Sequence, residues 1–117
     1  MKNLALVLLL LPLPAWADDP SIEAVRTQKS GGDWSFSVTL KHPDSGWDHY
    51  ADGWEVLDAD GMRLGYRLLA HPHEHEQPFT RSLGGVAIPA GTDSVFIRAH
   101  CLVDGWGAQM FEVTLGD

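Results

Sequence analysis

The chain has 117 residues, of which 44% are apolar and 21% charged, a composition that excludes a disordered tail and suits one folded domain. Sixteen acidic against eight basic residues give a net charge of −8, so the surface repels phosphate backbones and no nucleic-acid partner is expected. The single cysteine excludes both an internal disulfide and a four-cysteine zinc site.

The N-terminal segment has the pattern of a secretory signal peptide. Lys2 supplies a positive charge, residues 4–11 are an apolar run, and Ala15-Trp16-Ala17 has the small-x-small form of a cleavage site. The apolar run is much shorter than the roughly 20 residues that a membrane-spanning helix needs. We therefore expect a signal peptide at residues 1–17, cleaved after Ala17, and one periplasmic domain at residues 18–117 with no membrane span.

Beyond Pro20, short stretches rich in Val, Ile, Phe, Trp and Thr alternate apolar and polar residues between Gly, Pro and Asp. This pattern predicts strands rather than helices. The predicted strands, in chain order, are Ile22–Gln28, Trp34–Lys41, Trp54–Asp58, Met62–Ala70, Phe79–Ile88, Ser94–Val103 and Gln109–Leu115. Seven strands in one small domain predict an all-β fold, a seven-stranded antiparallel sandwich of the immunoglobulin-like or fibronectin type III-like kind.

The sixth predicted strand assigns its side chains to two faces by alternation. Cys101 shares a face with apolar residues such as Ile97 and Ala99, so it should point inward, whereas His100 should point outward. A buried thiol has a raised pKa and reacts slowly, so Cys101 is expected to be a core residue and not a metal ligand. Met110 is likewise expected at a core position.

The connections fall into two groups if successive strands alternate in direction. The short turns at residues 30–33, 58–61 and 89–93 then share one end of the sandwich, and the segments at 42–53, 71–78 and 104–108 share the other. This assignment requires Gly84-Gly85 to form a bulge, because a chain reversal there would add a strand and move the last segment to the opposite end.

All the histidines lie in or beside the segments assigned to the second end. In His71-Pro72-His73-Glu74-His75, alternate residues of an extended segment would project three imidazoles to one side. Imidazole is the commonest protein ligand for copper and zinc. We predict a copper or zinc site, in a carrier, sensor or accessory protein, whose candidate ligands are His71, His73, His75, His49, His42 and His100. The alternative is a set of solvated loop histidines with no shared ligand.

The same end is rich in aromatic residues. Trp47, Tyr50 and Trp106 are candidate partner-binding residues, and the alternative is that the two tryptophans plug the open end of the sandwich. Trp54 is expected in the core. Arg81 either recruits a carboxylate or pairs with a nearby acid. The second candidate function is accordingly a metal-free interaction module that docks an envelope protein through this end.

An enzyme is not expected, because no nucleophile elbow, glycine-rich phosphate loop or HExxH motif occurs. A zinc-assisted hydrolase is the weaker alternative. In it, zinc would activate water and Glu74 or Glu76 would act as the base.

A set of segments carries a resemblance to a known group of proteins. They are Gly46-Trp47-Asp48-His49-Tyr50-Ala51-Asp52-Gly53-Trp54, His71-Pro72-His73, Glu76-Gln77-Pro78-Phe79-Thr80-Arg81-Ser82 and His100-Cys101. In these the chain resembles small exported proteobacterial proteins of uncharacterised function. The resemblance covers most of residues 18–117 and implies export and a sandwich fold, without an activity or a ligand set.

Overall fold

The structure is a computed structural model that describes residues 19–116. The predicted signal peptide and its cleavage site after Ala17 lie outside these residues. Within the described part of the chain, no helix is long and apolar enough to cross a membrane.

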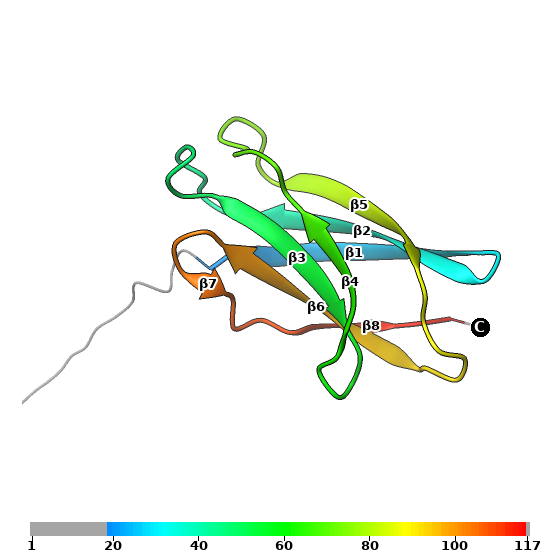
Figure 1. The fold of residues 1–117 in the computed structure, drawn as a ribbon. Coiled ribbons are helices and arrows are strands. Elements are labelled where there is room, and N and C mark those ends of the chain that lie inside the picture. The colour runs from blue at the N-terminus through cyan, green and yellow to red at the C-terminus, as the bar shows by residue number, and fades with distance from the viewer. Residues whose placement is uncertain (1–18, 117) are drawn as a thin grey trace, which may run out of the picture.

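Two antiparallel sheets face each other, which confirms the all-β fold and its sandwich architecture (Figure 1). The smaller sheet has the order β1-β2-β5, with bounds Ser21–Ser30, Asp33–Lys41 and Phe79–Val86. The larger sheet has the order β4-β3-β6, with bounds Arg63–Leu68, Ala51–Leu57 and Ser94–Cys101. The far edge of β6 pairs first with β8 (Phe111–Thr114) and, near its end, with β7 (Gly105–Trp106).

Alternation along the strands fills the space between the sheets. Phe36, Val38 and Leu40 of β2 are buried and face the inward residues of β6, such as Ile97. Trp54 of β3 is fully buried, as expected. Complete burial of a large apolar side chain contributes about 1.5–3 kcal/mol, so this interior fixes the register of both strands.

The inward position predicted for Cys101 is confirmed, since it is fully buried while His100 is only partly so. Its position at the end of β6 matters as much as its burial. Cys101 pairs with Ala51 at the start of β3, so the thiol lies where the interior opens toward the loops.

The prediction of seven strands is wrong by one, because the segment expected to be a loop at 104–108 contains β7. Gly105 has a φ of 82°, a value that glycine adopts freely, and this turns the chain so that Trp106 pairs with His100. Strand β8 therefore begins only at Phe111. Met110 precedes it and is 46% exposed, so its expected core position is also wrong.

A bulge at Gly84-Gly85 keeps the strand directions as predicted. The pairing of β2 with β5 steps from Trp34↔Val86 to Phe36↔Leu83, which leaves one extra residue on β5. Gly85 has a φ of 66°. Because the chain bulges and does not reverse, the connections after β2, β4 and β6 lie at the same end of the sandwich (Figure 1).

Candidate functional site

Side-chain contacts tie together the three connections at this end. Asp44, from the connection after β2, bonds to the backbone of His73, from the connection after β4. His49 Nε2 lies 3.7 Å from a carboxylate oxygen of Asp104, which follows β6. The predicted convergence of these segments is therefore confirmed.

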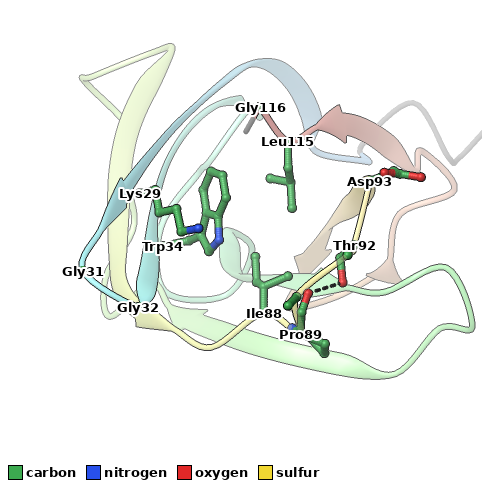
Figure 2. Close-up of a pocket in the computed structure, with 12 residues that line it drawn as sticks. Lys29, Gly31, Gly32, Trp34, Ile88, Pro89, Thr92, Asp93, Leu115 and Gly116 are labelled. Carbon is green, nitrogen blue, oxygen red and sulfur yellow. Dashed lines mark hydrogen bonds between the residues drawn. The ribbon is translucent and has the colours of Figure 1, made fainter.

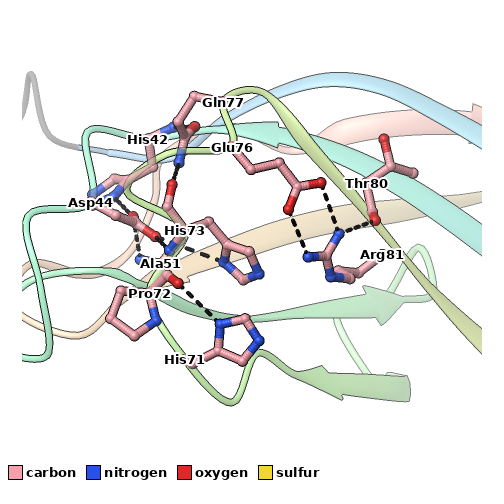
Figure 3. A network of polar contacts seen from close by, with 10 residues as sticks. All are labelled: His42, Asp44, Ala51, His71, Pro72, His73, Glu76, Gln77, Thr80 and Arg81. Atoms are coloured by element: carbon pink, nitrogen blue, oxygen red, sulfur yellow. Dashed lines mark hydrogen bonds and ion pairs between the residues drawn. The ribbon is translucent and has the colours of Figure 1, made fainter.

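Asp44 is the hub of these contacts (Figure 3). Its side chain is fully buried, and Oδ1 accepts hydrogen bonds from His42 Nδ1 at 2.6 Å and from the Ala51 N–H at 3.0 Å. Its Oδ2 accepts a third from the His73 N–H at 2.7 Å. Gln77 adds a second link, because its Oε1 accepts the His42 N–H and its Nε2 donates to the His73 carbonyl.

The bond to Asp44 fixes the chemistry of the His42 ring. Because a carboxylate can only accept, His42 Nδ1 carries a proton, and in the neutral ring Nε2 then has the lone pair. That Nε2 atom is buried and has no hydrogen-bond partner. An imidazole that donates one nitrogen to a carboxylate and offers the other is the usual arrangement of a metal-binding histidine.

His42, His49 and Cys101 form a group able to hold a metal ion, since a ligand atom from each lies within 4.8 Å of the other two. The His42 and His49 rings meet edge to face, with centroids 5.0 Å apart. The backbone of His49 forms a tight turn in which its N–H donates to the Gly46 carbonyl and its carbonyl accepts from the Ser45 N–H. Two imidazoles and a thiol are suitable donors for zinc or copper.

Asp104 borders this group. Its Oδ2 lies 3.7 Å from His49 Nε2 and 3.7 Å from Cys101 Sγ, and the thiol donates to it. Burial raises the pKa of the Cys101 thiol. The predicted burial of the Cys101 thiol is confirmed. Burial does not exclude the thiol from the group, because its sulfur lies within 4.8 Å of a ring nitrogen of His42 and of His49.

The loop of three histidines does not have the expected extended form, because the chain turns at Glu74 and His75. His73 is buried and stacked on Phe79, with ring centroids 4.0 Å apart and an interplanar angle of 8°. Burial, followed by the nearby Arg81 charge, lowers the pKa of His73. His71 and His75 are exposed, and His71 Nδ1 donates to the Pro72 carbonyl. Metal binding by these three residues stays a prediction.

His100, the remaining candidate ligand, belongs to a different environment. Its Nδ1 lies 2.5 Å from Asp52 Oδ1, and its ring meets Trp106 edge to face at 4.8 Å. Strand alternation directs it to the face of β6 opposite to Cys101. A ligand role for His100 stays a prediction.

The candidate partner-binding residues also have different surroundings and do not form one cluster with the donors. Trp47 is 67% exposed, and its ring and that of Tyr50 meet edge to face with centroids 5.8 Å apart. Trp106 is partly buried under the Arg98 guanidinium at 4.6 Å. Arg81 forms an ion pair with Glu76 at 3.0 Å, as the second interpretation predicted, and this bond lowers the Glu76 pKa.

A cavity of about 360 Å³ opens at the other end of the sandwich, remote from the histidines (Figure 2). Trp34, Ile88 and Leu115 form its apolar wall, and Lys29 and Asp93 lie at its rim. The wall is the open edge of the core, and the two charged side chains do not converge on a common point (Figure 2). The metal-binding candidates lie at the histidine-bearing end instead.

Comparison with known proteins gives similarities in sequence and in structure. No family model matches the chain. The chain is 43% identical over 96 residues to a protein of Halomicrobium mukohataei named "Putative lipoprotein", a match that covers 81% of this chain. It covers 47% of the relative, so the chain spans about half the length of that protein. This relative is archaeal, so the resemblance is not limited to proteobacterial proteins.

Among solved structures, the chain is similar to the hypothetical protein PH1083 from Pyrococcus horikoshii OT3. The TM-score is 0.53 at 15% sequence identity, and the match covers 84% of this chain and 86% of that chain. At this identity the likeness extends to the fold alone.

The residues that sequence reasoning undervalued are Asp44, Gln77 and Asp104. The sequence patterns above assign no role to any of these three residues. One local pattern could have singled out both acids: Asp44 follows His42 by two positions, and Asp104 follows Cys101 by three. Each acid therefore lies within reach of a donor that precedes it at the end of a strand.

Proposed function

We propose that this protein binds a transition-metal ion in the cell envelope, through His42, His49 and Cys101 at one end of a fibronectin type III-like sandwich. One observation carries the proposal: the buried, unpartnered Nε2 of His42, set beside two other donors while Asp44 holds the opposite ring nitrogen. An unsatisfied polar atom in the interior is costly, and a metal ion would satisfy it.

The sheet order supports the proposed fold, and the sequence relative supports the proposed location in the cell envelope. The order β1-β2-β5 facing β4-β3-β6-β8 is the one expected of a fibronectin type III-like domain, with β7 as an addition. The name of the Halomicrobium relative indicates an envelope protein, in agreement with the signal peptide predicted at residues 1–17.

Binding requires the donors to move closer together. With bonds of about 2.3 Å to sulfur and 2.0–2.1 Å to nitrogen, donors around a tetrahedral ion lie roughly 3.3–3.6 Å apart. The present group spans up to 4.8 Å, so an ion would draw it inward by about 1 Å. His49 lies in a surface turn, and we assign most of this movement to it.

The test is titration of metal-depleted protein with Zn(II) and, under reducing conditions, with Cu(I). We expect near-stoichiometric binding that His42→Ala and His49→Ala each weaken by at least about tenfold. His75→Ala, which removes an exposed imidazole from the same end, is the matched control. Absence of tight binding of either ion to the folded protein would refute the proposal, and a loss confined to His75→Ala would return the site to the histidine loop.

A metal-free docking function is the second candidate, and a specific observation favours it. Trp47 and Val103 are 67% and 61% exposed on the connections that carry the donors. Exposed aromatic and aliphatic residues on neighbouring loops are typical of binding surfaces. This candidate takes precedence if the titration shows no metal binding.

The proposal assigns no catalytic step. Glu76, one of the two bases considered for a hydrolase, is engaged by Arg81 and has a lowered pKa, which makes it a poor proton acceptor.

A further inference from the structure

The position of Asp104 distinguishes between the kinds of metal ion that the site would accept. His42, His49 and Cys101 are three donors, enough for a three-coordinate ion such as Cu(I). A divalent ion of the zinc type is instead four-coordinate, and its fourth donor is commonly a carboxylate oxygen or water.

Asp104 lies near the distance that a fourth donor needs from two members of the group. The edges of a tetrahedron around zinc are about 3.3–3.6 Å when one donor is sulfur and the others are nitrogen or oxygen. Asp104 Oδ2 lies 3.7 Å from His49 Nε2 and 3.7 Å from Cys101 Sγ, close to two of these edges. Its side chain is 27% exposed, so it would close the solvent side of a group whose other members, His42 and Cys101, are buried.

Local charge favours the same assignment. The fully buried Asp44 accepts three hydrogen bonds directly behind His42, and Cys101 becomes a thiolate when it binds a metal. With Asp104, two negative groups then border the space between the donors, and a third, Asp44, lies behind His42. A divalent ion neutralises two of these charges and a monovalent ion only one, so the Coulomb attraction to these groups is stronger for the divalent ion.

We propose that Asp104 is the fourth ligand and that the site is selective for a divalent first-row transition metal over Cu(I). This inference rests on the proposed function, since it presupposes that His42, His49 and Cys101 bind a metal. The buried, unpartnered Nε2 of His42 is the independent evidence that these residues serve a ligand.

The experiment compares the parent chain with Asp104→Asn, using Zn(II) and Cu(I) as the two probes and competing chelators to measure affinity. We expect the substitution to weaken Zn(II) binding by at least about tenfold, because a neutral amide oxygen is a poor zinc donor. Cu(I) affinity should stay close to that of the parent, because Cu(I) prefers the soft sulfur and imidazole donors that remain. Asp48→Asn, which removes the same charge from an exposed position of the same end, is the control.

Co(II) supplies a second readout that a purely electrostatic role would not change. In the parent, Co(II) should give the intense visible absorption of a tetrahedral centre together with a thiolate charge-transfer band. In Asp104→Asn the visible bands should shift and weaken, and in Asp48→Asn they should not.

Equal Zn(II) affinity in the parent and Asp104→Asn, or an equal loss for Cu(I) and Zn(II), would overturn the assignment of Asp104 while leaving the metal site standing. If the parent binds neither ion, the proposed function itself fails, and this inference fails with it.

Discussion

His42 and Asp44 form a hydrogen bond of 2.6 Å in which both side chains are fully excluded from solvent. The two residues are separated by one position, yet the same carboxylate also bonds to the backbone of Ala51 and His73. A single buried group therefore orients the His42 ring and joins two connections of the sandwich.

Asp44→Asn should reduce metal affinity without removing a ligand. The amide keeps the shape of the carboxylate but accepts the His42 proton weakly, so the ring loses its fixed orientation and some basicity. Loss of such a partner commonly costs about 10–100-fold in affinity. Zn(II) titration measures the effect, and urea unfolding of the metal-free variant separates it from lost stability. Unchanged affinity would show that Asp44 serves the fold alone.

Cys101→Ala should abolish tight metal binding, in contrast to the expectation from strand alternation alone. Burial raises the thiol pKa, so the metal-free protein should react slowly with alkylating reagents. Because binding must then displace the thiol proton, affinity should rise by about tenfold per pH unit while the thiol is protonated in the free protein. Titrations at several pH values check this slope. Retention of parent-like affinity by Cys101→Ala would exclude the thiol as a ligand.

His73→Phe should reduce the sensitivity of the fold to acid. Its pKa lies below the ordinary value of 6.5 because the ring is buried, so below that pH the unfolded chain binds a proton that the folded chain does not. This contribution to stability is complete above pH 6.5 and is lost as the pH falls toward the pKa of the folded state. Phenylalanine keeps the stacking on Phe79 but cannot titrate.

Urea unfolding at about pH 7.5 and about pH 5.0 measures the difference for the parent and for His73→Phe. His75→Phe, at the exposed turn, is the control. An identical fall in stability for the parent and His73→Phe would mean that His73 is not the group responsible.

Glu55→Gln should destabilise the larger sheet by about 1–2 kcal/mol. Glu55 is 2% exposed and accepts hydrogen bonds from Arg63 at 2.9 Å and from Arg98 at 2.8 Å. The amide retains one acceptor oxygen and presents a donor to the other guanidinium. Arg63→Ala should cost less, about 0–1 kcal/mol, because that side chain is half exposed. Chemical denaturation of both variants checks the ranking, and a larger effect for Arg63→Ala would contradict it.

The alternation of apolar and polar residues along the strands made the buried positions predictable from the sequence. The inward positions of Phe36, Val38 and Cys101 follow from the period of two, and burial of the apolar residues keeps the register. The location of the histidines at one end followed from strand directions, which depended on the bulge at Gly84-Gly85. The short strand β7 was not predictable, because two residues carry no periodicity.

The donor group was harder to predict because its contacts are long-range. Asp44 and His73 are 29 positions apart, and their hydrogen bond depends on the packing of two connections that have no regular pattern. The histidine loop was misjudged for a related reason. Its alternation suggested an extended segment, but stacking of His73 on Phe79 and bonding of Gln77 to His42 turn the chain there.

His42 follows β2 in the smaller sheet, whereas Cys101 ends β6 in the larger one. An ion shared by these two residues would cross-link the sheets at the end of the sandwich where the interior is open. Sandwich domains often use a disulfide for this purpose, but a chain with one cysteine cannot form one. Metal binding would then stabilise this end reversibly. It would slow local opening and amide hydrogen exchange at this end and leave the opposite end unchanged.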